Sequence, residues 1–234
     1  MTPQRNDDRL GCSAPLGSLL FADAAEAARG MVQGGLAVYP TETFFGIGCR
    51  ADRAGSVLRV FEAKRRKADM PLPVILASLD QLGLVAAPSP AIEADLEALA
   101  AFWPGPFTLL LPARPDLPEA LTSGTGRIAL RVSSHPAARA LAGACGFPIV
   151  SSSANISGRA PVTQAGALDP ELLAFLRPGL DGVLAPPPPS PEPGGGLAST
   201  IVEPLGSRRL LLRREGALPT SRLAEAGFTT IFPK

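Results

Sequence analysis

Residues 39–48 read Tyr39-Pro40-Thr41-Glu42-Thr43-Phe44-Phe45-Gly46-Ile47-Gly48. The apolar residues 36–39 predict a short buried strand, and the proline, hydroxyls and glycines that follow predict a loop at its end. In such a loop, backbone N–H groups and hydroxyls can approach a ligand closely. The same residue types are common in ordinary tight turns, so this stretch alone leaves both interpretations open.

Helices and strands alternate on both sides of this stretch. Residues 22–32 carry apolar side chains at helical spacing and end at Gly34-Gly35. Downstream, residues 56–63 predict a helix and residues 73–77 a second buried strand. This alternation is typical of the α/β class.

The second half of the chain adds strands that need not be parallel. Residues 107–111 and 128–132 are strand-like with only loop chemistry between them, so we expect an antiparallel pair. The other predicted elements are helices at 91–102, 135–145 and 171–176, and strands at 148–151, 199–203 and 209–213. The order predicts a mixed parallel/antiparallel sheet flanked by helices.

The expected domain organisation is simple. Residues 1–17 are expected to form a loose leader, and residues 18–234 one domain. Within it, residues 185–196 read APPPPSPEPGGG, which predicts a surface loop. The strands after this loop are too few to bury a core alone, so it is not expected to be a domain boundary. Residues 219–234 are expected to form a short tail.

Composition limits the class of protein. Hydrophobic residues make up 46% and charged residues 18% of the chain, which is typical of a globular protein. The 22 basic and 21 acidic residues nearly cancel, so contact with nucleic acid would need a local patch. Cys12, Cys49 and Cys145 form no C-x-x-C pair and indicate reduced thiols. With no signal peptide or long apolar stretch, we expect a cytoplasmic protein without membrane contact.

The sequence contains no standard phosphate-binding motif. A Walker A motif is absent, and Gly46-x-Gly48 has Ala51 where a dinucleotide fingerprint needs its third glycine. The basic run Lys64-Arg65-Arg66-Lys67 ends a predicted helix, where cations complement the helix dipole. Lys64 and Arg66 alternate with their neighbours, so an extended exit from the helix would point both towards phosphates.

Small polar residues follow another predicted strand, at Ser151-Ser152-Ser153-Ala154-Asn155-Ile156-Ser157-Gly158. They fit turn chemistry or a ligand site. A serine nucleophile would need a base, and the single histidine, His135, precedes a proline at a helix start, where capping is the expected role. Ser199, Arg131 and Arg214 lie at other strand ends, as expected for the ligand crevice of an open α/β sheet.

Seven segments between Ala24 and Ala217 resemble, in order and spacing, the YrdC family of threonylcarbamoyl-AMP synthases. Residues 39–48 are similar to Y-P-T-[DE]-T-x-[YF]-G-[LI]-G, 64–72 to K-x-R-P-x-x-x-P-L, 103–108 to W-P-G-P-x-T, 131–136 to R-x-P-x-H-P, 153–158 to S-A-N-x-S-G, 199–200 to S-T and 214–216 to R-x-G. Lys67 and Ser133 depart from this pattern, because each replaces a proline.

The resemblance implies a twisted single-domain α/β fold around a concave, basic cavity for ATP and L-threonine. It places Thr41, Arg131, Ser153 and Ser199 at the threonine or its carbamate, and Lys64, Arg66, Ser151, Asn155 and Arg214 at the nucleotide, with Lys64 and Arg66 as catalytic groups. The implied reaction joins ATP, L-threonine and bicarbonate into threonylcarbamoyl-AMP and pyrophosphate, for threonylcarbamoyladenosine in tRNA. No protein nucleophile is required, and Mg²⁺ would arrive with ATP, held mainly by its phosphates.

Two other functions stay open at this point. One is a carbamoyl-adenylate-forming domain like those of hydrogenase-maturation carbamoyltransferases, although this chain lacks the cysteine pairs of their zinc fingers. The other is a module that binds tRNA or double-stranded RNA weakly without synthase activity, supported by the run from Lys64 to Lys67. If the chain is a synthase, its product would pass to a separate tRNA threonylcarbamoyl transferase complex.

Overall fold

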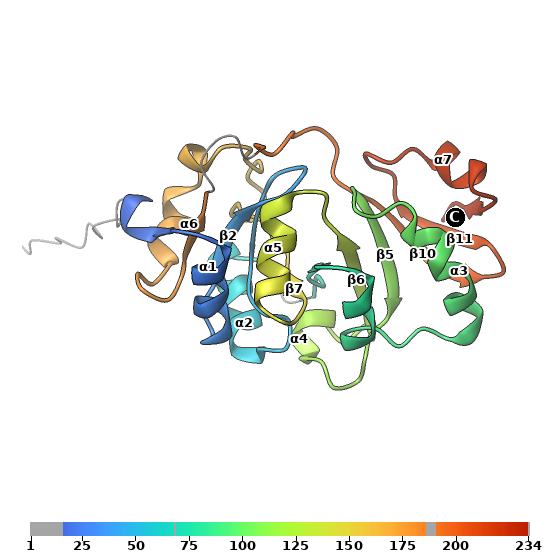
Figure 1. The fold of residues 1–234 in the computed structure, drawn as a ribbon, viewed down its shortest axis with the longest axis horizontal. Coiled ribbons are helices and arrows are strands. Elements are labelled where there is room, and N and C mark those ends of the chain that lie inside the picture. Colours follow the sequence, from blue (N-terminus) through green and yellow to red (C-terminus); the bar gives the residue numbers. More distant parts are fainter. Residues whose placement is uncertain (1–15, 68, 186–190, 234) are drawn as a thin grey trace, which may run out of the picture.

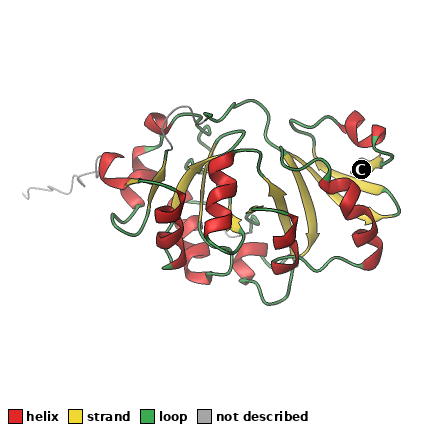
Figure 2. Cartoon of the chain, in the orientation of Figure 1, coloured by secondary structure: helices red, strands yellow, loops and turns green. Residues whose placement is uncertain are grey.

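The structure is a computed structural model that describes residues 16–67, 69–185 and 191–233. Two mixed β-sheets lie within a shell of helices (Figures 1 and 2). The smaller sheet has the strand order β1-β9-β2-β3-β8, and the larger has the order β12-β11-β10-β5-β6-β4-β7. The predicted mixed arrangement with flanking helices is confirmed, but it is divided between two sheets.

The strands are β1 Leu20–Phe21, β2 Ala37–Pro40, β3 Phe45–Gly48, β4 Val74–Leu76, β5 Phe107–Pro112, β6 Arg127–Val132, β7 Ile149–Val150, β8 Ser152–Ser153, β9 Gly182–Leu184, β10 Thr200–Gly206, β11 Arg209–Arg214 and β12 Thr229–Ile231. The α-helices are α1 Ala24–Val32, α2 Ala54–Lys64, α3 Pro90–Ala100, α4 Glu119–Thr122, α5 Pro136–Ala144, α6 Pro170–Phe175 and α7 Thr220–Glu225, with short 3₁₀ helices at Leu16–Leu19, Leu79–Leu84 and Ala165–Ala167. In the described ranges, every helix is too short or too polar to cross a lipid bilayer.

The stretch from Tyr39 to Gly48 is a hairpin and not a strand followed by a loop. β2 and β3 pair antiparallel with Tyr39 opposite Gly46, and β3 then pairs with β8. The expectation of a loop through residues 40–48 was therefore wrong for β3. Its two glycines weaken strand propensity, but they permit close pairing, while Phe45 and Ile47 are buried.

The larger sheet confirms the expected antiparallel pair. β5 and β6 run antiparallel, with Leu109 opposite Leu130. β10 adds parallel to β5, and β4 adds parallel to β6. Helix α5 contacts both β4 of the larger sheet and β2 of the smaller one, so it bridges the two sheets (Figure 1).

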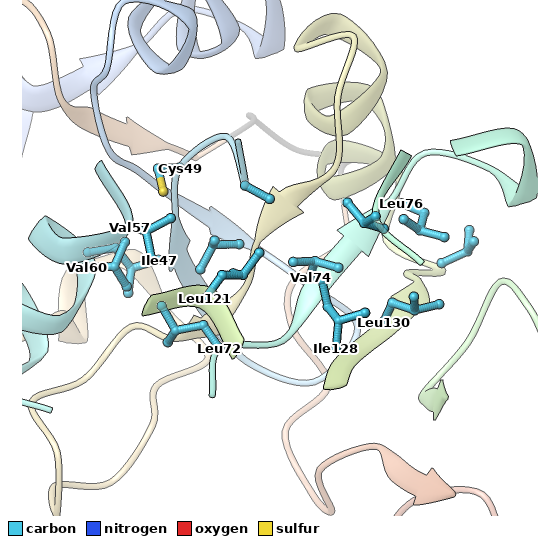
Figure 3. Close-up of a cluster of buried hydrophobic side chains, with 14 of the residues drawn as sticks. Ile47, Cys49, Val57, Val60, Leu72, Val74, Leu76, Leu121, Ile128 and Leu130 are labelled. Carbon is cyan, nitrogen blue, oxygen red and sulfur yellow. The ribbon is translucent and has the colours of Figure 1, made fainter. Parts of the chain in front are cut away.

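Two clusters of buried apolar side chains each contain residues of both sheets. Figure 3 shows Ile47 of β3 near Val57 and Val60 of α2, and Val74 of β4 near Ile128 of β6. All five side chains are at most 1% exposed. Removing this apolar surface from water fixes the sheets against each other.

Three segments of the predicted domain organisation can be compared with the structure. Of the expected leader, residues 1–15, including Cys12, lie outside the described residues, and so do residues 186–190 of the proline-rich loop. The expected tail, residues 219–234, contains α7 and the edge strand β12, which pairs parallel with β11. The C-terminal residues therefore extend the larger sheet.

Gly48 allows β3 to approach the strand that leads to Ser151, and it provides the first test. A Cβ atom at residue 48 would lie 1.6 Å from the Val150 carbonyl oxygen. We expect Gly48→Ala to lower the free energy of unfolding by about 3 kcal/mol, because the strands must move apart. Urea unfolding monitored by circular dichroism would measure it.

The matched control is Gly55→Ala, in the first turn of α2. No atom lies within 4 Å of a Cβ built there, so this change should leave stability unchanged or raise it by up to about 1 kcal/mol. Equal unfolding midpoints for the two variants would contradict the close approach at Gly48.

Candidate active site

A pocket with a volume of about 490 Å³ is lined by residues of both sheets. This volume is in the usual range for small-ligand sites. Its walls come from the β2–β3 turn, β8, the start of β10, β5, β6, the end of β11 and the segment after α2. The lining residues are Thr41, Thr43, Phe44, Phe45, Gly46, Arg66, Pro71, Pro73, Thr108, Leu110, Ala129, Arg131, Ser151, Ser152, Ser153, Ala198, Ser199, Ile201, Arg213 and Arg214.

The pocket brings together most of the site residues predicted from the sequence. Seven of them line it: Thr41, Arg66, Arg131, Ser151, Ser153, Ser199 and Arg214. Lys64 and Asn155 are not lining residues; both are buried directly behind the loop that carries Ser153. Segments far apart in the sequence therefore converge at one place, as the resemblance implied.

The β2–β3 turn is stabilised by the side chain of Thr41. Thr41 is 2% exposed, and its Oγ1 donates a hydrogen bond to the Phe44 carbonyl oxygen at 2.7 Å. The same oxygen accepts from the backbone N–H groups of Thr43 and Phe44, each at 3.3 Å. Such side-chain bonds to nearby backbone are typical of turns that begin with threonine. Thr41 thus shapes the pocket wall, and its contact with threonine stays a prediction.

Lys64 lies in a different position from the one expected. It is the last residue of α2 and is 2% exposed. Its Nζ donates to the carbonyl oxygen of Ser153, and to the Asn155 carbonyl oxygen at 2.7 Å. The Lys64 carbonyl oxygen in turn accepts from Ser157 N at 2.8 Å. Lys64 therefore fixes residues 151–158, the Ser/Asn-rich loop, to the end of α2.

Lys64 and Arg66 do not point the same way, because the chain does not leave α2 in an extended conformation. Arg65 caps the helix in the left-handed region with φ 49°, which turns the chain sharply. Arg66 then lines the pocket, with Nε 3.2 Å from the Met70 carbonyl oxygen and Nη2 3.0 Å from that of Pro71. The extended exit on which a shared direction of the two side chains depends is therefore absent at Arg65, and Arg66 alone of the two lines the cavity.

The surroundings of Lys64 make its charge less stable than that of an exposed lysine. Burial, and secondly the charge of Arg66, lower the pKa of Lys64 to about 8. The carbonyl oxygens of Ser153 and Asn155 act in the opposite direction, because they accept hydrogen bonds from an ammonium group. Lys64 is therefore mainly charged at neutral pH but loses its proton more readily than usual.

Arg214 and Ser199 connect two strand ends that are adjacent in space. Arg214 donates to the Ser199 carbonyl oxygen from Nε at 3.0 Å and from Nη2 at 2.8 Å. Thr108 Oγ1 lies 2.8 Å from Ser199 Oγ, so it also helps to fix this serine. Burial, followed by the charge of Arg131, lowers the pKa of Arg214. Arg131 and Arg214 therefore both line the pocket and are close enough for their charges to interact.

Other polar groups near the pocket have structural roles. His135 caps α5 as expected, with Nδ1 accepting from Ala137 N at 3.2 Å. Tyr39 donates to the Val150 carbonyl oxygen at 2.7 Å, and burial raises the pKa of its phenol, so it stays neutral. Within the described part of the chain, no three His, Cys, Asp or Glu side chains are grouped as a metal site.

Several contributors to the site were missed from the sequence, among them Thr108, Arg213 and Glu42. Thr108 and Arg213 line the pocket, and Glu42 forms an ion pair with Arg131. Thr108 lies within the W-P-G-P-x-T segment, which was a signal for it. Arg213 precedes the predicted Arg214 on β11, and because adjacent side chains of a strand point to opposite faces, the prediction of Arg214 gave no signal for Arg213. It also pairs with Glu203.

Comparison with known proteins finds several relatives. The family Sua5_yciO_yrdC, described as "Telomere recombination", matches residues 30–215. A protein of Xanthomonas campestris pv. campestris (strain B100), named threonylcarbamoyl-AMP synthase, is 40% identical over 160 residues, which cover 68% of this chain and 84% of the relative. A protein of the same name from Xanthomonas axonopodis pv. citri (strain 306) is 38% identical over 163 residues, or 68% of this chain and 86% of the relative.

Solved structures agree with the sequence matches. P. abyssi Sua5 complexed with L-threonine is 33% identical, with a TM-score of 0.73 over 87% of this chain and 56% of that one. A variant of the same Sua5 gives a TM-score of 0.76 over 90% of this chain and 61% of that one. This chain therefore spans less than two thirds of those Sua5 chains. T. kodakarensis HypF, at 16% identity and a TM-score of 0.64 over 82% of this chain and 24% of that one, shares the fold alone.

The contacts of Lys64 lead to a test of its role. We expect Lys64→Ala to lower the free energy of unfolding by about 2 to 3 kcal/mol, because the carbonyl oxygens of Ser153 and Asn155 lose a buried donor. Thermal and urea unfolding would measure it.

The control is Lys67→Ala, in the same basic run but exposed. It should change stability by less than about 0.5 kcal/mol. If both variants unfold alike, Lys64 does not fix the loop.

Proposed function

The chain belongs to the Sua5/YciO/YrdC family, and from that premise we propose that it is a threonylcarbamoyl-AMP synthase (L-threonylcarbamoyladenylate synthase). The observation that carries the proposal is the pocket in which Arg66, Arg131 and Arg214 meet hydroxyl side chains from both sheets. Guanidinium groups recognise carboxylates and phosphates through paired hydrogen bonds. Of the expected substrates, ATP carries phosphates and L-threonine a carboxylate, and bicarbonate is also an oxyanion.

The proposed chemistry needs no covalent enzyme intermediate. The amino group of threonine combines with bicarbonate to give a carbamate and water, and a carbamate oxygen then attacks the α-phosphorus of ATP. The bond from that phosphorus to the bridging oxygen breaks, and pyrophosphate leaves with its Mg²⁺. The protein must bring anions together and stabilise shifting negative charge, which positioned arginines can do.

The pocket walls suggest where each substrate lies. We assign the threonine carbamate to the wall with Thr41, Arg131, Ser153 and Ser199, and the nucleotide to Arg66, Ser151 and Arg214. Lys64 and Asn155 do not line the pocket but support the loop that carries Ser151 and Ser153, since the Lys64 ammonium donates to this loop. Direct contact of Lys64 with phosphate stays a prediction. Mg²⁺ enters as part of the ATP substrate.

The biological setting is part of the same proposal. Threonylcarbamoyl-AMP is an activated intermediate, and a transferase complex acting on tRNA would consume it, in the cytoplasm. Weak binding of tRNA or double-stranded RNA would use the exposed Arg65 and Lys67.

The direct test is to incubate the purified protein with ATP, Mg²⁺, bicarbonate and L-threonine, and to detect threonylcarbamoyl-AMP and pyrophosphate by mass spectrometry. Controls with L-serine and without an amino acid define the substrate. We expect an adenylate that depends on threonine. Adenylate formed without threonine would support the carbamoyl-adenylate alternative, and ATP binding without any product would contradict synthase activity.

A mutation tests the place of the nucleotide. We expect Arg214→Ala to lower kcat/KM at least about 100-fold, because a pocket cation is lost where negative charge develops. Arg209→Ala on the same strand is the control, since Arg209 is exposed and not a lining residue. Both melting temperatures should stay within about 3 °C of the wild type. A large loss of stability in Arg214→Ala would make Arg214 a structural residue instead.

A further inference from the structure

Arg131 is held by a carboxylate that does not itself line the pocket. Its Nε lies 3.1 Å from Glu42 Oε1, and each side chain is 11% exposed. Neither atom has an aligned hydrogen-bond partner in the described ranges, so their attraction is that of an ion pair. Because Glu42 approaches Nε, it leaves the other edge of the guanidinium for a ligand in the pocket.

The second oxygen of Glu42 is held by Ser133. Ser133 is 0% exposed, and its hydroxyl donates to Glu42 Oε2. The same hydroxyl oxygen accepts from His135 N at 3.2 Å. An ionised carboxylate can only accept, so the hydroxyl proton must point to Glu42. Ser133 is also the position at which this chain has a hydroxyl in place of the proline of the family pattern.

The backbone around Glu42 is held as well. The Glu42 carbonyl oxygen accepts from Gly194 N at 3.2 Å, and the Thr43 carbonyl oxygen accepts from Gly195 N at 2.7 Å. His135 Nε2 lies 2.8 Å from the Pro191 carbonyl oxygen. With Nδ1 accepting from the α5 backbone, Nε2 must carry the proton and donate to Pro191. Glu42 is thus fixed through both its side chain and its backbone.

We propose that Glu42 and Ser133 are positioning residues that orient Arg131 towards the carboxylate of the amino-acid substrate. Ser133 restricts the Glu42 carboxylate, and Glu42 restricts the rotation of the Arg131 guanidinium and balances part of its charge. The identity of the bound carboxylate rests on the proposed function. The orientation of Arg131 rests on the contacts alone and can be tested separately.

The kinetic test uses Ser133→Ala, with Ser134→Ala as the matched control because Ser134 is exposed beside it. We expect Ser133→Ala to raise the KM for L-threonine about tenfold, since a hydrogen bond to a buried charge is lost. kcat and the KM for ATP should stay within about twofold, as expected when only ground-state binding of one substrate weakens. Ser133→Thr, which keeps the hydroxyl, should restore the KM, and Glu42→Gln should raise it at least as much as Ser133→Ala.

A second measurement does not depend on activity. The ¹⁵N–¹H signal of Arg131 Nε, assigned by its loss in Arg131→Lys, should shift in Ser133→Ala and in Glu42→Gln but not in Ser134→Ala. An unchanged Arg131 signal together with an unchanged threonine KM would overturn the positioning role. If the KM for L-threonine and the KM for ATP rise to the same extent and the melting temperature falls, the positioning role is also overturned, in favour of a general structural role. If the signal shifts in Ser133→Ala and Glu42→Gln but the wild-type protein makes no adenylate, the positioning role is supported and only the proposed function is overturned.

Discussion

The repulsion between like charges is the constraint on which this site depends. Arg66, Arg131 and Arg214 converge on one pocket, and without ligand each must be held by oxygen atoms of the protein. Arg66 and Arg214 donate to backbone carbonyl oxygens, which are neutral. A neutral acceptor fixes a guanidinium without cancelling its charge. Arg66 and Arg214 therefore keep their positive charges, which the proposed function assigns to phosphates, and the fold supplies the carbonyl groups that hold them.

The two sheets provide those carbonyl groups at strand ends and turns. Lys64 fixes the Ser/Asn-rich loop from behind, so the end of α2 and the end of the smaller sheet move together. Thr200 connects the start of β10 to the segment that follows β11. Its Oγ1 donates to the Leu218 carbonyl oxygen and accepts from Gly216 N at 3.0 Å. These hydrogen bonds hold segments that are distant in the sequence together at the pocket wall, and such preorganisation is what a site for charge stabilisation requires.

The sequence predicted the class of fold and seven of the residues that line the pocket, because apolar runs and motif order carry that information. It did not predict β3, since Gly46 and Gly48 have low strand propensity and the strand is stabilised only by pairing with β2 and β8. It misplaced Lys64, because the left-handed conformation of Arg65 has no signature in an arginine. The link between Ser133 and Glu42 joins residues 91 positions apart, and only the folded chain brings them together.

The different partners of Arg66, Arg131 and Arg214 fit the different charges of the proposed substrates. ATP is strongly anionic, so arginines that keep their full charge suit its phosphates. Threonine has both an ammonium and a carboxylate, so an uncompensated cation next to it would repel one end while attracting the other. Pairing Arg131 with Glu42 reduces that repulsion while leaving hydrogen-bond donors in place. If the proposed function holds, the geometry of Arg131, more than its charge, selects the amino acid.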